Sequence, residues 1–303
     1  RPGILFLEAH VAYRTDLALE AKSRCPDIPG VQEQCEHFAG IDISRIRVET
    51  QEAAQKLGKH VGNYVTFTLP KEFIADPRCR EAGAKRLAGE LDALLPPGPG
   101  LLAGLGNRKI TPDALGPRTA EGIVVTRHLQ NHCKEVLGHE VRSVAAFPTG
   151  VMGVTGIETV EAVGAMVKAL SPAALIAVDA LAALDSSHIG AMVQLNDTGI
   201  SPGAGVGNFQ KGLNRETLGV PVLALGIPLV LSAEAILESG LRRTGNGYLA
   251  QNLQTLLEED FLSMVVTPKD IDAMVKDGAR LLSQGLNLAF FGENYGPLCA
   301  MLP

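Results

Sequence analysis

The segment ALIAVDALAA, residues 174–183, decides the fold of this chain. It is apolar except for Asp179, which is typical of a strand buried on both faces of a parallel sheet. A second run of the same kind, VPVLALGIPLVL, lies at 220–231, and a helical pattern, ETVEAVGAMVKAL, precedes the first run at 158–170. Because strands and helices alternate in this way, the sequence predicts an α/β fold with helices on both faces of a sheet.

Further elements are predicted on either side of this centre. In chain order they are a strand at 43–49, a helix at 51–59 with Thr50 as its N-cap, a strand at 63–69, a helix at 77–95, a strand ending in the turn GLGN at 104–107, a helix at 118–132, a strand at 141–147, and two helices between 247 and 291, the last with Pro268 at its first position. The Gly/Pro-rich pieces between them are predicted to be irregular connections within one domain.

The composition describes a globular protein and excludes several classes. The 303 residues are 46% hydrophobic, and no stretch approaches the roughly 18 apolar residues that a membrane span needs. Twenty-seven basic residues against 33 acidic ones give a net charge of -6, without the clustered Lys and Arg of a nucleic-acid footprint. The N-terminal residues do not follow the pattern of a secretory leader. We therefore expect a cytoplasmic protein that contacts neither a membrane nor nucleic acid directly.

Neither a nucleotide cofactor nor a metal is expected. The turn GLGN follows a buried strand, but Lys109 stands where a dinucleotide-binding loop would need its third glycine. The five cysteines lack the spacing of zinc ligands. His128 and His132, four residues apart on a predicted helix, could hold a metal, although the glutamate of the H-E-x-x-H motif is missing. A metallopeptidase therefore stays open as an alternative.

Two aspartates are the strongest candidates for chemistry. Asp113 lies on a short loop stiffened by Pro112 and Pro117, where it is either a catalytic base or a helix N-cap. Asp179 lies within an apolar strand, where a lone charge costs several kcal/mol unless it is paired, solvated or protonated. Two such carboxyl groups at the ends of neighbouring strands could share a proton and activate a water. A buried structural hydrogen bond is the alternative for Asp179.

A single Asp-Thr-Gly turn at 197–199 does not indicate a pepsin-like protease. That class needs two such turns in an all-β scaffold, and this chain has one in an α/β pattern. Asp197 therefore remains a candidate only for a supporting position beside the site.

The motifs, taken together, resemble a known family. The blocks YRTDLALEA, GLGNRKITPDALGP, FPTGVMGVTGIET, AVDALAALDSSHIG, QLNDTGISPGAGVGN and LGVPVLALGIP occur in this order and closely resemble the germination proteases of endospore-forming bacteria. The resemblance implies a three-layer αβα fold with a mainly parallel or mixed sheet, similar to hydrogenase maturation proteases. It also implies an endopeptidase of the spore core that degrades small acid-soluble DNA-binding spore proteins, forms a homotetramer and uses Asp113 and Asp179.

The same resemblance gives a role to the N-terminal segment. Thr15-Asp16-Leu17-Ala18 is similar to the Thr-Glu-(Phe/Ile)-Ala sites of family substrates, which are cut after the acidic residue. It implies a zymogen that cuts itself between Asp16 and Leu17, with residues 1–16 as propeptide and 17–303 as a single α/β peptidase domain. In the alternative interpretation Thr15 or Asp16 only caps a helix.

The remaining site residues are expected from their position near the two aspartates. Backbone N–H groups of two glycine loops would stabilise the oxyanion of the reaction. An acidic residue before the cut would need a basic pocket. The oxyanion candidates are Gly106, Asn107, Gly205, Gly207 and Asn208, and the basic candidates are Arg108, Lys109, Arg118 and Arg127. A small-molecule hydrolase or phosphorylase on a similar scaffold, or a non-catalytic binding protein, would fit the fold equally.

Overall fold

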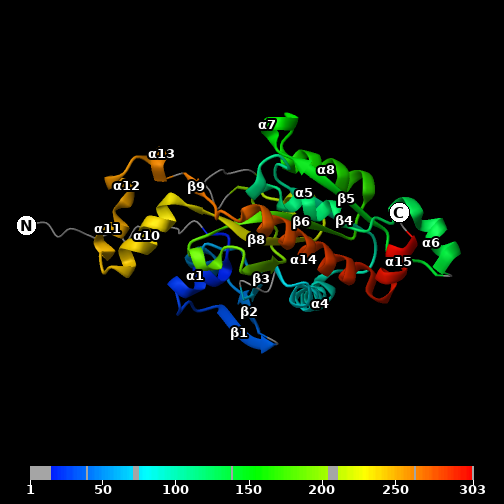
Figure 1. Ribbon diagram of the computed structural model, residues 1–303, viewed down its shortest axis with the longest axis horizontal. Helices are drawn as coiled ribbons and strands as arrows, with labels where there is room; N and C mark the ends of the chain where they lie inside the picture. The colour runs from blue at the N-terminus through cyan, green and yellow to red at the C-terminus, as the bar shows by residue number, and fades with distance from the viewer. Residues whose placement is uncertain are drawn as a thin grey trace, which may run out of the picture.

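A mixed β-sheet with helices on both faces forms the molecule (Figure 1). The structure is a computed structural model that describes residues 15–38, 40–70, 75–137, 139–203, 211–262 and 264–301. Within these residues nine strands form one sheet in the order β1-β2-β3-β7-β8-β6-β4-β5, with β9 paired to β8. The strands are β1 Val31–Phe38, β2 Ile41–Val48, β3 Gly62–Thr68, β4 Gly100–Leu105, β5 Val144–Gly150, β6 Ala174–Ala183, β7 Met192–Asn196, β8 Val222–Ser232 and β9 Val265–Val266.

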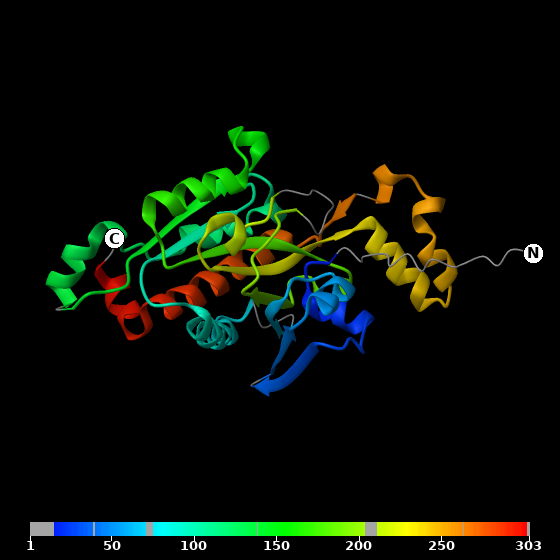
Figure 2. The same cartoon turned by 180° about the vertical axis from the view of Figure 1, so that it is seen from behind.

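The helices differ widely in length. Those that cover the sheet are α1 Ala18–Arg24, α2 Gln51–Leu57, α4 Pro77–Leu94, α5 Leu115–Glu121, α8 Thr159–Leu170 and α14 Ile271–Phe291. The others are α6 Gln130–Leu137, α7 Met152–Thr155, α9 Arg215–Leu218, α10 Ala233–Arg243, α11 Gly247–Gln251, α12 Leu253–Leu256, α13 Glu259–Leu262 and α15 Tyr295–Met301. Helices α10 to α13 project beyond one end of the sheet, as both views show (Figure 2).

The sheet consists of a parallel and an antiparallel half. Strands β8, β6, β4 and β5 are parallel, as the alternation of strands and helices predicts, whereas β1, β2, β3 and β7 are antiparallel. The two halves join where β7 pairs antiparallel with β8. The predicted fold class, α/β with helices on both faces of a mixed sheet, is therefore confirmed.

Both faces of the parallel half are buried. Helices α4, α5 and α14 cover one face, where Ile176 and Val178 of β6 belong to the main apolar core. Helix α8 covers the other face over Leu175 and Ala177, while α1 and α2 cover the antiparallel half on that face. Successive residues of β6 thus enter different cores, which explains why the segment 174–183 is almost wholly apolar.

Most predicted elements occur within a few residues of their expected bounds. The helix at 77–95 is α4, the strand at 174–183 is β6, and the Thr50 side chain caps α2 by accepting from Ala53 N at 3.1 Å. Strands β1 and β7 and helix α10 were not predicted. Every residue of β1 is exposed or half-buried, so its sequence carries no apolar alternation.

The helix predicted at 118–132 is wrong. Helix α5 ends at Glu121, and α6 begins only at Gln130. Between them the chain bonds to other parts of the fold: Val124 N donates to the Asn287 side chain at 2.9 Å, and Thr126 Oγ1 accepts from Val144 N at 3.0 Å. These tertiary hydrogen bonds replace those of a continuous helix.

Two predicted helix starts are also corrected. The last helix, α14, begins at Ile271 after Asp270, so Pro268 precedes the helix instead of opening it. Helix α5 begins at Leu115, within the segment expected to be a loop.

Candidate active site

A cleft lies at the carboxyl ends of β4 and β6, where ligands of open α/β sheets usually bind. Its volume is about 290 Å³. The residues that matter for its chemistry are Asp16, Gly106, Asp113, Asp179, Ala182 and Ser201. We call this cavity the carboxylate cleft, because three carboxyl groups line it.

Asp113 follows β4 on the short 3₁₀ helix η1, Thr111–Asp113, which Pro112 stiffens. Its Oδ2 accepts a hydrogen bond from Asn107 N at 2.7 Å. Burial raises the pKa of the Asp113 carboxyl, while the Asn107 hydrogen bond acts in the opposite direction. Gly106 permits this approach, because it has a φ of +107° and a Cβ there would overlap the Asp113 backbone oxygen and carboxylate.

Asp179 lies within β6 and is only 7% exposed. Its Oδ1 accepts from Ala180 N at 2.8 Å. Burial raises the pKa of Asp179 well above its usual value, and the negative charges of Asp113 and Asp16 raise it further. Burial and the two neighbouring charges therefore favour the protonated form of Asp179.

Asp16, from the segment before α1, lines this cleft. Asp16 N donates to Ala182 O at 3.1 Å, and Ala182 N donates to Asp16 Oδ2 at 2.8 Å, so Asp16 pairs with β6 three residues after Asp179. Lys59 Nζ donates to the carbonyl oxygen of Thr15 at 2.6 Å. Burial raises the pKa of Asp16, although the charge of Lys59 and the Ala182 hydrogen bond favour its ionised form.

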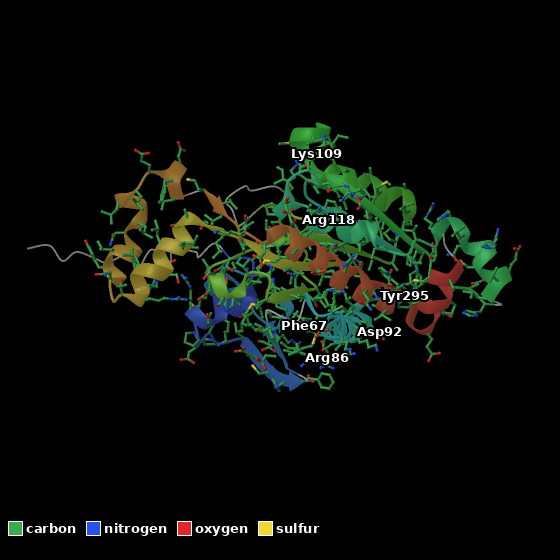
Figure 3. The ribbon with its side chains drawn as sticks, viewed as in Figure 1. Phe67, Arg86, Asp92, Lys109, Arg118 and Tyr295 are labelled. Atoms are coloured by element: carbon green, nitrogen blue, oxygen red, sulfur yellow. The ribbon has the colours of Figure 1, made fainter. Side chains whose placement is uncertain are left out.

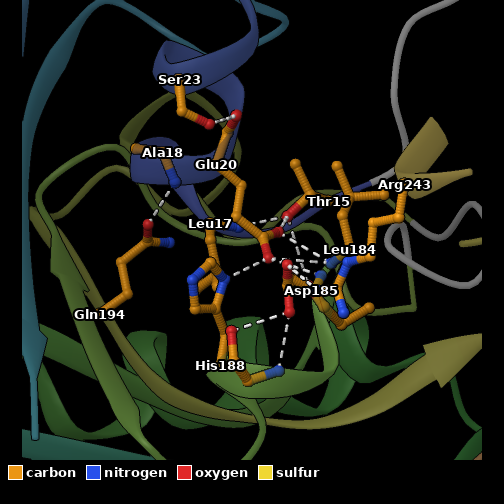
Figure 4. A network of polar contacts seen from close by, with 12 residues as sticks. Thr15, Leu17, Ala18, Glu20, Ser23, Leu184, Asp185, His188, Gln194 and Arg243 are labelled. Carbon is orange, nitrogen blue, oxygen red and sulfur yellow. Dashed lines mark hydrogen bonds and ion pairs between the residues drawn. The ribbon is translucent and has the colours of Figure 1, made fainter. Parts of the chain in front are cut away.

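Leu17 and Ala18, which follow Asp16, also contact the sheet. The Leu17 side chain is completely buried among Leu181, Met192, Leu231 and their neighbours. Gln194 contacts the main chain twice: its Nε2 donates to Asp16 O at 2.7 Å, and its Oε1 accepts from Ala18 N at 2.6 Å. Figure 4 shows the Gln194 contact with Ala18.

Glu20 anchors the start of α1 in a polar network (Figure 4). Its carboxylate accepts from Leu184 N, Asp185 N and His188 Nδ1, the last at 2.6 Å, and from the Thr15 hydroxyl. Burial would raise the pKa of Glu20, but these hydrogen bonds together lower it, so Glu20 binds as a carboxylate.

Helix α1 begins where the sequence allowed a helix, but with a different cap. Its N-cap is Leu17, without a side-chain capping bond, so neither Thr15 nor Asp16 is the cap. Thr15 Oγ1 instead accepts from Leu17 N at 3.1 Å. The segment 15–17 is therefore bound to the sheet, Leu17 has an extended backbone, and the helix follows from Ala18.

Other sequence candidates lie outside the carboxylate cleft. Asp197 accepts from Asn63 N at 2.8 Å and from the Asn63 side chain at 2.6 Å, which ties β3 to the end of β7. His128 and His132 are exposed and lie on η2, Arg127–Leu129, and on α6, so they do not share one helix. Among the described residues, no group of three His, Cys, Asp or Glu side chains could hold a metal.

The basic candidates lie outside the cleft, whereas Gly106 and Asn107 lie at or beside it. Arg108 pairs with Glu121 at 3.0 Å, and none of Arg108, Lys109, Arg118 and Arg127 lines the cleft. Figure 3 shows Lys109 and Arg118 on the part of the molecule that carries α5 and α7. Gly106 lines the cleft, and Asn107 N–H is directed to Asp113. Gly205, Gly207 and Asn208 lie outside the described residues.

Sequence reasoning missed Lys59, Gln194, Glu20 and His188. A buried polar side chain in the apolar stretch MVQLN was a signal for Gln194, but β7 itself was not predicted. The other three come from segments far apart in the chain. Among the described residues, no helix combines the length and apolar character that a membrane crossing requires.

Comparison with known proteins gives consistent matches. A family model described as germination protease matches residues 7–242. The germination protease of Caldanaerobacter subterraneus subsp. tengcongensis is 39% identical, over 91% of this chain and 93% of the relative. Those of Clostridium tetani and Halalkalibacterium halodurans are 33% and 32% identical, over 92% and 94% of this chain and 95% and 92% of the relatives.

One solved structure is similar at much lower identity. It is a [NiFe] hydrogenase maturation protease, HycI, from Thermococcus kodakarensis KOD1. The two chains are 17% identical with a TM-score of 0.35, over 65% of this chain and 98% of the other.

Proposed function

Since the chain belongs to the germination protease family and is thus a spore-germination endopeptidase, we propose that it is a self-processing zymogen that uses Asp113 and Asp179. In this proposal the enzyme cuts its own Asp16–Leu17 bond and then degrades small acid-soluble spore proteins at Thr-Glu-(Phe/Ile)-Ala sites. The resemblance of the sequence blocks supports these substrates, a homotetramer and a location in the spore core.

The observation that carries the proposal is the position of Asp16. This residue lies in the same cleft as Asp113 and Asp179, and its charge acts on Asp179. Its main-chain N–H donates to Ala182 O, and its side-chain carboxylate accepts from Ala182 N, so Asp16 binds β6 through both main chain and side chain. The segment therefore resembles a bound peptide substrate.

The two carboxyl groups suit a water-activating mechanism. Asp113, the more readily ionised of the two, takes a proton from a water, whose oxygen attacks the Asp16 carbonyl carbon. The C=O electron pair moves onto the carbonyl oxygen. When this intermediate collapses, the C–N bond breaks and the Leu17 nitrogen receives the proton of Asp179. The products are a carboxyl group on Asp16 and an amine on Leu17.

Two contacts support selection of the residues at the cut. Lys59 places a positive charge near Asp16, and Ala182 N binds the Asp16 carboxylate directly. Lys59 thus takes the role expected for Arg108 or its neighbours. The buried apolar surroundings of Leu17 suit a large apolar residue after the cut.

The experiment is intact mass over time for the purified chain at mildly acidic and neutral pH. It is run beside Asp113→Asn and Asp179→Asn, with Asp197→Asn as matched control, because Asp197 is a carboxylate outside the cleft. We expect loss of residues 1–16 in the parent and the control, and a rate at least about 100-fold lower in the two cleft variants.

An added Thr-Glu-Ile-Ala peptide should follow the same pattern. Cleavage retained in either cleft variant removes that aspartate from the mechanism. Inhibition of the parent by a chelator, reversed by zinc, would instead favour the metallopeptidase alternative with His128 and His132. Turnover of phosphoesters or nucleosides with the peptide left intact would favour a small-molecule enzyme.

A further inference from the structure

We infer that Gln194 is a catalytic residue, whose side-chain amide stabilises the oxyanion formed at the Asp16 carbonyl. The inference rests on the proposed cut between Asp16 and Leu17. Gln194 Nε2 donates to Asp16 O at 2.7 Å, while Gln194 Oε1 accepts from Ala18 N at 2.6 Å. One side chain therefore bridges the main chain on both sides of the peptide bond to be cut.

These two contacts fix the orientation of the amide group. A carbonyl oxygen can only accept and an N–H can only donate, so the Nε2 must face Asp16 and the Oε1 must face Ala18. A flipped amide would place two acceptors against each other at Asp16 and two donors at Ala18. The donor is thus held ready before any charge develops on the carbonyl oxygen.

The sheet register places Gln194 in the same cross-strand row as Asp179. Gln194 of β7 pairs with Gly226 of β8, and Gly226 pairs with Asp179 of β6. Residues paired across neighbouring strands point to the same face, so Gln194 and Asp179 project from the same side of the sheet. Gly226 lies between these two residues in the row, and it has no side chain that would separate them. The peptide can therefore lie between Gln194 and Asp179.

Burial makes this hydrogen bond effective. Gln194 is 3% exposed, so water hardly competes for its amide. When the attacking water oxygen bonds to the Asp16 carbon, the C=O electron pair moves to the oxygen that Gln194 already contacts. The hydrogen bond then becomes charge-assisted and strengthens. It therefore stabilises the transition state more than the bound substrate, which lowers the activation barrier.

The test is steady-state cleavage of a Thr-Glu-Ile-Ala peptide by full-length parent and Gln194→Met, a change that keeps the side-chain volume and removes the amide. Because Asp16 of the propeptide lies in the cleft until the chain is cut, kcat is expressed per molecule that has lost residues 1–16 by intact mass. We expect kcat to fall by about 10²–10³. Thr66→Val is the matched control, because Thr66 pairs with Gln194 in the next strand and its buried hydroxyl has no hydrogen-bond partner among the described residues. The control should keep the parent kcat.

A modified peptide separates the two ends of the amide. Replacing the Ala N–H of the substrate by an ester oxygen removes the donor to Gln194 Oε1. This change should lower kcat/KM of the parent by about 5-fold to 10-fold, the value of one buried hydrogen bond, and have little effect on Gln194→Met. If Gln194→Met fails to fold, the parent alone still tests the inference, because a parent that does not respond to the ester overturns it: Gln194 would then not contact the substrate as it contacts Ala18.

The outcomes distinguish this inference from the function on which it rests. A parent that leaves the peptide intact overturns both. A parent that cuts, with Gln194→Met raising KM at unchanged kcat, overturns the oxyanion role alone, because Gln194 would then bind substrate and transition state equally. Equal loss of kcat in Thr66→Val would also overturn it, since the effect would come from packing.

Discussion

In the proposed function, Lys59 supplies the preference for an acidic residue before the cut. It follows the left-handed Gly58 that ends α2, and its ammonium group bonds to the Thr15 carbonyl oxygen. Burial lowers the pKa of Lys59, while the charges of Asp16 and Glu20 favour its protonated form. A buried cation with acidic neighbours discriminates strongly between a carboxylate and its neutral amide.

Lys59→Met should therefore reduce discrimination between Thr-Glu-Ile-Ala and Thr-Gln-Ile-Ala peptides. We expect the ratio of their kcat/KM values to fall by about tenfold or more, since the charge of Lys59 acts on the carboxylate and two opposite charges near each other in a protein interact by roughly 1–4 kcal/mol. Lys56→Met, on the exposed side of α2, is the matched control and should leave the ratio unchanged. An unaltered ratio in Lys59→Met would show that another group reads the acid.

At the scale of elements, the end of β4 and the helix η1 form one rigid unit around Gly106. The Asn107 N–H binds the Asp113 carboxylate, and the Gly106 backbone allows Asp113 to fold back against the strand end. The TPDALGP block is therefore built to hold one carboxyl group at a fixed place in the cleft.

Gly106→Ala should disrupt this unit. The added methyl would overlap the Asp113 backbone oxygen, and a φ of +107° is strained for alanine by about 1–3 kcal/mol. We expect peptide cleavage to fall at least about 100-fold, because a displacement near 1 Å has that effect on a catalytic group.

The matched control is Gly153→Ala in α7, where an added methyl meets nothing and the backbone conformation is ordinary. Cleavage kinetics and thermal unfolding of both variants check the prediction. A Gly106→Ala enzyme with the parent rate would show that Asp113 needs no fixed position.

For the whole molecule, the buried Asp179 opposes folding whenever it is ionised. The pKa of Asp179 is raised in the folded state from the usual 3.8. Its contribution to the free energy of unfolding is therefore fully present below pH 3.8 and is lost as the pH rises through the raised pKa. Asp185 is the opposite case. Hydrogen bonds from Ser187 lower its pKa, so its contribution exists above 3.8 and is lost as pH falls.

Asp179→Asn should accordingly raise the free energy of unfolding near pH 7, by on the order of 1 kcal/mol or more, and have little effect near pH 3. Asp185→Asn should lower it near pH 7. Urea unfolding from pH 3 to 8 measures both free energies, and intact mass after each scan identifies the conditions under which the parent has remained uncut and can be compared with the variants. A destabilising Asp179→Asn at neutral pH would mean that Asp179 is a stabilising structural group.

The sequence by itself determined the elements with strong local signals. The apolar run of β6, the leucine spacing of α4 and the Thr50 cap of α2 each depend on residues within a few positions of one another. Burial on both faces forces an apolar sequence on β6, and this made the single Asp179 conspicuous. The parallel half of the sheet and the candidate aspartates Asp113 and Asp179 could therefore be identified without the structure.

Only the tertiary structure decided where the chain departs from the conformation that its local sequence favours. The segment 118–132 has a helical pattern, yet hydrogen bonds with Asn287 and Val144 replace those of a continuous helix in its middle. The exposed strand β1 has no pattern to find. Lys59 and Gln194 reach the Asp16 segment from the turn after α2 and from β7, because the antiparallel half of the sheet folds against it. Contacts between residues so far apart in the chain depend on packing, which local spacing does not encode.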